Sequence, residues 1–149
     1  MINYITNLEN YLNSVYANGK KVVGVNESDL YLIHVFGYNE KHSFSVKLSK
    51  NTISFYGYDS EADYDLNEQN FEEIKGLIEL AINHGTRLDI SYKENKTEYS
   101  YELISKEKLS VADVERLYSE MRQKSGKAIV PCHIECSNFL GTNIVNVEI

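Results

Sequence analysis

Between Lys20 and Tyr58, apolar residues recur at every second position in short runs that polar residues interrupt. A period of two is typical of a β-strand with one buried face, and the polar interruptions at 26–29 and 49–51 have the composition of turns. Within this region, Leu30–Phe36 is apolar at nearly every position, which predicts a strand that is covered on both faces or lies centrally in its sheet. The pattern therefore predicts a meander of about four antiparallel strands.

Three other segments carry apolar residues at helical spacing and predict helices. The first covers residues 3–17. The second is the best defined, because Asn67 is a suitable N-cap and Gly85 is a suitable stop. The third is expected to follow Ser110 and to end at Gly126.

Further strands are predicted in the second half of the chain. Alternation at 88–92 and 99–103, on either side of a polar stretch, predicts a hairpin, and 128–136 and 143–149 predict two more strands. Hairpins joined to helices indicate an α+β fold, with a mainly antiparallel sheet of about six to eight strands packed with three helices. Because the chain has the size of one domain and lacks a Gly/Ser-rich linker, residues 1–149 are expected to form a single domain.

Composition constrains the compartment and the kinds of ligand. The sequence shows no signal peptide pattern and no apolar run long enough to span a membrane. Two cysteines, Cys132 and Cys136, cannot build a disulfide framework, which favours a reducing compartment. A sequence pI near 5.1 argues against direct nucleic-acid binding, because such binding neutralises phosphates with Lys and Arg. We therefore expect a cytoplasmic protein that binds neither membrane nor nucleic acid directly.

The net charge of −7 is concentrated in one stretch, the acidic segment Asp59–Glu79, which carries eight carboxylates and a single cation, Lys75. Outside this segment, acidic and basic residues are equal in number. Crowded carboxylates repel one another unless a partner, an ion or solvent compensates them. In an extended backbone, the carboxylates at 59, 61, 63 and 65 would line one edge at intervals of about 7 Å.

Three interpretations of the acidic segment are open. It is a binding face for Lys and Arg side chains of a partner, a solvated loop that caps the following helix, or a calcium loop. The calcium loop fits poorly, because Leu66 stands where the sharp turn needs glycine. Under the first interpretation, the partner-binding residues are Tyr58, Asp59, Glu61, Asp63, Tyr64, Asp65, Glu68, Glu72 and Glu79.

A second candidate site lies at 132–136, where Cys132, His133 and Cys136 are all zinc-ligand residue types. In a strand, however, the two cysteines would share a face about 13 Å apart, while His133 would point to the other side. They are more simply small core residues. A metal site with His84 as a fourth ligand, or a thiol–histidine pair, is the alternative. We assign no catalytic residue, no metal and no cofactor from the sequence.

The leading functional hypothesis is a small acidic inhibitor that occludes a basic, nucleic-acid-handling protein, such as a nuclease, through the acidic segment. Immunity proteins against nuclease toxins and phage-encoded inhibitors of host defence are functional analogues, since they are often small acidic domains. One alternative is a small enzyme or metal-binding protein that uses Cys132, His133 and Cys136. Another is a structural subunit whose strand edges pair with a second chain, and the sequence leaves the oligomeric state open.

Overall fold

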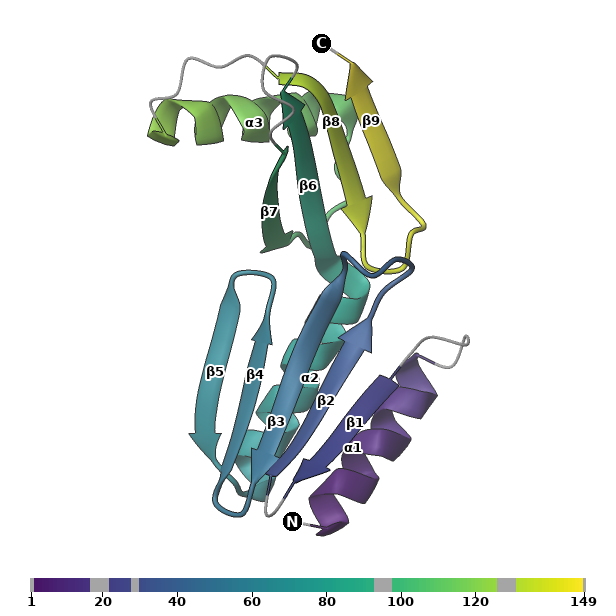
Figure 1. The fold of residues 1–149 in the computed structure, drawn as a ribbon, viewed down its shortest axis with the longest axis vertical. Helices are drawn as coiled ribbons and strands as arrows, with labels where there is room; N and C mark the ends of the chain where they lie inside the picture. Colours follow the sequence, from purple (N-terminus) through teal and green to yellow (C-terminus); the bar gives the residue numbers. More distant parts are fainter. Residues whose placement is uncertain (1, 17–21, 28–29, 93–97, 126–130, 149) are drawn as a thin grey trace.

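The computed structural model describes residues 2–16, 22–27, 30–92, 98–125 and 131–148, which form three helices and nine strands. Figure 1 shows the first half of the chain around one sheet and the second half around another, stacked end to end. All described strand pairs are antiparallel. The predicted α+β class, with antiparallel strands and three helices, is therefore confirmed. None of the helices in the described part of the chain is long and apolar enough to cross a membrane.

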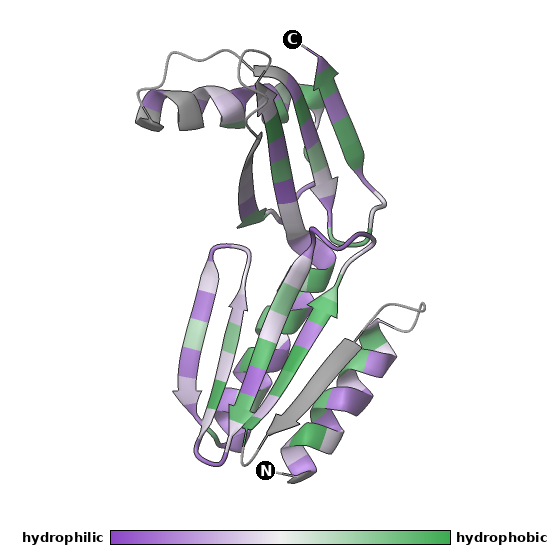
Figure 2. Cartoon of the chain, in the orientation of Figure 1, coloured by the Kyte–Doolittle hydropathy of each residue, from purple (hydrophilic) through white to green (hydrophobic). Residues whose placement is uncertain are grey.

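The first sheet is a five-stranded meander in chain order. Buried and half-buried residues alternate along its second and third strands, and Figure 2 shows a matching alternation of hydropathy along the third. The strand predicted at 30–36 therefore lies inside the sheet but is buried on one face only. The fifth strand belongs to the acidic segment and forms an edge of the sheet. The strands are β1 (Val22–Glu27), β2 (Leu30–Phe36), β3 (Ser43–Ser49), β4 (Thr52–Gly57) and β5 (Ser60–Asp65).

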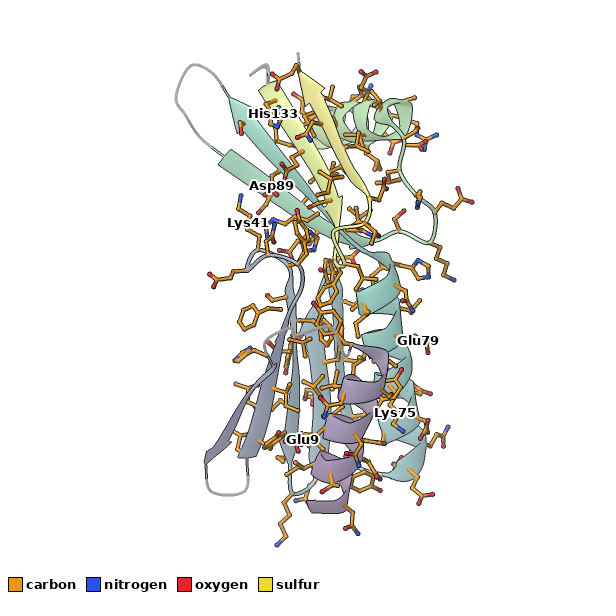
Figure 3. The ribbon with its side chains drawn as sticks, turned by 90° about the vertical axis from the view of Figure 1, so that its right-hand side faces the viewer. Glu9, Lys41, Lys75, Glu79, Asp89 and His133 are labelled. Atoms are coloured by element: carbon orange, nitrogen blue, oxygen red, sulfur yellow. The ribbon has the colours of Figure 1, made fainter. Side chains whose placement is uncertain are left out.

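Two helices, α1 (Ile2–Val15) and α2 (Glu68–His84), cover the same face of this sheet. Figure 3 shows both helices on one side of the strands, and no described element covers the other side. The helix α2 begins as predicted, because the Asn67 side chain accepts a hydrogen bond from the Asn70 backbone N–H at 2.8 Å. Its apolar stripe faces the sheet and supplies five buried residues to the core: Phe71, Ile74, Ile78, Ala81 and Ile82.

The second sheet has the strand order β7-β6-β8-β9. It contains the predicted hairpin, β6 (Gly85–Tyr92) and β7 (Glu98–Ile104), and the two predicted tail strands, β8 (Pro131–Asn138) and β9 (Ile144–Glu148). The helix α3 (Val111–Ser125) packs on this sheet through the buried Val114 and Tyr118. The glycine expected to end α3, Gly126, lies outside the described residues.

The two sheets meet where α2 runs into β6 without an intervening loop. Phe139, from the turn after β8, is 0% exposed and packs in the core of the first sheet. Its N–H donates to the Gly85 carbonyl at 2.8 Å, and its carbonyl accepts from the Tyr38 N–H at 2.9 Å. Gly85 is required here, because a Cβ at this position would lie 2.6 Å from the Tyr58 ring. Phe139 therefore ties the second half of the chain to the first core.

A buried polar network crosses the same junction. His42 is 0% exposed, and hydrogen bonds join its Nδ1 to the Tyr58 hydroxyl at 2.6 Å and its Nε2 to Ser137 Oγ at 2.8 Å. Both ring nitrogens are thus satisfied, as a buried imidazole requires. The network links β8 of the second sheet to the two loops that carry His42 and Tyr58.

Candidate partner-binding surface

The carboxylates of β5 lie on the open face of the first sheet. Ala62 is buried in the core, so its neighbours in the strand, Glu61 and Asp63, point to the face that the helices leave uncovered. Asp65 follows the same alternation, and all three carboxylate residues are exposed. Asp63 accepts a hydrogen bond from Ser54 Oγ at 2.6 Å on the neighbouring strand. The row of carboxylates at every second position that the sequence predicts is present at 61, 63 and 65. It lies in an edge strand and not in a loop.

Tyr58 and Asp59 form the two-residue turn between β4 and β5. Their φ angles of 53° and 62° are both positive, which is the feature of a type I′ hairpin turn. The turn leaves Asp59 exposed but directs Tyr58 inward, where it is 1% exposed and bonded to His42. Burial raises the pKa of the Tyr58 hydroxyl above its usual range. Tyr58 is therefore a core residue and contributes no surface to a partner.

The remaining carboxylates lie on α2, behind the sheet. Glu68, Glu72 and Glu79 are exposed, and so is Glu73, which was not among the expected site residues. The acidic segment is therefore divided between two surfaces, the open face of the sheet and the exposed side of α2. Tyr64 belongs to the α2 side, because its side chain lies on the same face of β5 as that of Ala62 and is directed toward α2.

The single cation of the acidic segment is engaged within the protein. Lys75 Nζ lies 3.3 Å from Glu72 Oε1. It also lies 5.2 Å from the centre of the Tyr11 ring and 5.0 Å from that of Phe71, within the range of cation–π interactions. Figure 3 shows Lys75 between α1 and α2. Lys75 is therefore directed toward α1 and away from Glu73 on the side of α2 beside β5, whereas Glu79 interacts with Tyr11 on the α1 side.

The β5 side of α2 contains a groove between α2 and β5 with a volume of about 510 Å³. Its apolar floor consists of three half-buried side chains, Tyr64, Leu77 and Leu80. Two exposed carboxylates, Glu73 and Glu79, line it, and no lysine or arginine is among its lining residues in the described chain. We call this feature the α2 groove; its lining residues are Tyr64, Glu73, Gly76, Leu77, Glu79, Leu80, Asn83 and His84.

The cysteine–histidine segment lies in β8, where the described side chains of His133 and Cys136 point to opposite faces of the sheet. Cys136 is 2% exposed, and burial raises the pKa of its thiol to about 11, so the thiol is protonated at neutral pH. His133 points to the other face and its Nδ1 lies 2.8 Å from Glu148 Oε1. The side chain of Cys132 lies outside the described part.

His84 and Cys136 both line a cleft of about 210 Å³ next to the C-terminal end of α2. A protonated, buried thiol is a poor nucleophile, so this proximity does not make a catalytic pair. Across the residues that the structure describes, no three side chains of His, Cys, Asp or Glu meet as metal ligands would.

No protein-family model, no curated protein and no solved structure matches the chain. The functional interpretation therefore depends on the geometry alone. The sequence interpretation missed the α2 groove, because Leu77 belongs to the helical apolar stripe and reads as a core residue. The available signal was Gly76, a residue that disfavours helix in the middle of the best-defined helix.

Proposed function

We propose that this protein binds a basic partner protein and occludes its positive surface, using the exposed carboxylates of α2 together with the α2 groove. The observation that carries the proposal is the arrangement around α2. Lys75 is held between the two helices, while the exposed Glu73 lines an apolar groove beside β5, and Glu79 lines the same groove at its edge toward α1, where it also contacts Tyr11. Carboxylates next to apolar surface provide both charge complementarity and contact area for a protein interface.

The exposed carboxylates would act mainly on the rate and specificity of association. Charges at a solvent-exposed rim attract a basic partner over a distance of about 10 Å at moderate salt, and salt weakens this attraction. The apolar floor would supply contact that is less sensitive to salt. Binding should therefore weaken as salt rises without disappearing at once.

The carboxylates of β5 have a different role in this proposal. The edge strand β5 has one side without a strand partner in the described structure, and such edges pair readily with other chains. Charged residues on an edge strand oppose that pairing. Glu61, Asp63 and Asp65 thus protect the sheet edge, and the partner is bound on the helix side.

The partner that we propose is a nuclease or another nucleic-acid-binding protein in the cytoplasm. Such proteins carry dense Lys and Arg surfaces that neutralise phosphates. The acidic chain would compete with nucleic acid for that surface and act as an inhibitor. The local excess of carboxylates in the acidic segment supports this choice of partner class.

Two variants of equal net charge test the location of the binding surface. E73Q/E79Q removes two carboxylates from the α2 groove, and E61Q/D65N removes two from the sheet edge. We would use wild type and both variants as baits in native cell extract at low and high salt, and identify the retained proteins by mass spectrometry.

A basic protein should be retained by wild type and by E61Q/D65N at low salt, and lost from E73Q/E79Q. The purified partner should then lose affinity for nucleic acid when wild-type protein is added. Equal retention by all three baits would show that the α2 carboxylates do not bind the partner.

A further inference from the structure

We infer that the α2 groove is a docking site for one amphipathic helix of the partner, with apolar residues on one face and Lys or Arg beside them. This inference rests on the proposed function, because it specifies which part of a basic partner the α2 surface receives.

The apolar floor of the groove is the first observation. Leu77 and Leu80 lie three positions apart, so they are neighbours on the helix surface, and both are only half-buried. Neither belongs to the fully buried stripe of α2. Tyr64 continues the floor from β5. A partner helix that inserts apolar side chains here would complete the burial that the chain itself leaves unfinished.

Gly76 is the second, independent observation. It is exposed in the interior of α2, where glycine costs about 1 kcal/mol relative to alanine. A Cβ at this position would meet nothing within 4 Å, so packing inside the protein does not require glycine here. Gly85 differs in this respect, since its missing side chain makes room for Tyr58. A small residue at 76 instead permits close approach of another backbone from outside.

The groove is long enough for a helix laid along it. Its lining residues on α2 run from Glu73 to His84, which corresponds to about three turns or 16 Å. The exposed Glu73 lies where a basic residue on the flank of that helix would meet it, and Glu79 lies at the edge of the groove toward α1.

Synthetic peptides provide a defined probe. One peptide of about five turns, made of Leu, Lys and Ala, places all Leu on one helix face. A second peptide has the same composition in shuffled order, so its charge is identical and its apolar face is lost. Both would be titrated into the isotopically labelled protein at low salt, and the affinity and the shifted backbone amides recorded by NMR.

The amphipathic peptide should bind and shift the amides of Tyr64, Gly76 and Leu80, and the shuffled peptide should bind about tenfold more weakly. Gly76→Gln places a side chain in the groove without changing the charge, and it should fold because glutamine favours helix more than glycine does. This variant should lose about tenfold in affinity. Ala112→Gln, an equivalent change at an exposed position of α3, should bind like wild type.

Equal affinities for the two peptides, or wild-type affinity in Gly76→Gln, would overturn helix docking. If both peptides bind equally and E73Q/E79Q weakens both, helix docking is wrong but binding of basic ligands by the α2 surface is supported. If neither peptide binds wild-type protein, both the docking inference and the proposed acidic surface fail.

Discussion

Acidification below pH 6.5 should destabilise this protein through His42. The imidazole is 0% exposed, both its nitrogens are bonded, and it lies at the junction of the two sheets. Burial, together with the positive charge of Arg87, lowers the pKa of His42 to about 4, although the nearby Asp89 partly opposes this shift. In the unfolded chain the pKa of histidine is about 6.5.

The sign and size of the effect follow from these two pKa values. As the pH falls below 6.5, the unfolded chain binds a proton that the folded chain does not, so the free energy of unfolding decreases. The decrease continues to about pH 4, where His42 protonates in the folded state as well. A difference of roughly 2.5 pH units corresponds to about 3 kcal/mol, a large part of the 5–15 kcal/mol typical of a domain.

Urea denaturation at a series of pH values between 7 and 4.5 measures this effect, with tyrosine fluorescence as the signal because the chain has 12 tyrosines and no tryptophan. The free energy of unfolding of wild type should fall more steeply than that of His42→Gln, by about 2 kcal/mol over this range. His34→Gln is the control, since it removes a half-exposed histidine of the open sheet face and keeps His42. Parallel curves for wild type and His42→Gln would refute this interpretation.

Four further changes have expected outcomes. Gly76→Ala should raise the free energy of unfolding by about 0.5–1 kcal/mol in urea denaturation, because its Cβ meets no atom and alanine favours helix. Asn67→Ala should lower it by about 1 kcal/mol through loss of the N-cap bond, and Asn67→Asp, which retains a capping oxygen, should lower it less. Phe139→Ala should cost about 3–5 kcal/mol, since this fully buried ring packs 5.1 Å from the Tyr16 ring, and a smaller loss would show that the junction repacks. Cys136 should react with a thiol reagent at neutral pH only after urea unfolds the protein, because its buried thiol is protonated; rapid reaction in the native state, followed by mass spectrometry of the peptide, would contradict this.

Local signals in the sequence were sufficient for most of the secondary structure. The helix α2 begins after Asn67 and ends before Gly85, as these two residues predicted. The alternating residues at 88–92 and 99–103 lie in paired strands. The division into two sheets has no local signal. It depends on pairing between distant segments, such as Ile90 with Ile134, and on α2 continuing directly into β6. Local periodicity does not specify such partners.

The candidate surface was only partly predictable for a related reason. The acidic segment reads as one cluster along the sequence, but it crosses from an edge strand to a helix on the opposite side of the sheet. Strand alternation directs Glu61 to the open face, whereas α2 carries Glu79 on the helix side. The positive φ angle at Tyr58 turns its ring into the core. His42, flanked by Lys41 and Ser43, has no sequence signal of burial.

We propose that the α2 surface, rather than the sheet edge, binds a basic protein. The most direct measurement is the affinity of the captured and purified partner for wild type, E73Q/E79Q and E61Q/D65N, by calorimetry at two salt concentrations. We expect E73Q/E79Q to bind at least about tenfold more weakly, with a smaller dependence on salt, and E61Q/D65N to bind like wild type. Equal weakening by both variants, which have the same net charge, would show that overall charge and not the α2 surface accounts for binding.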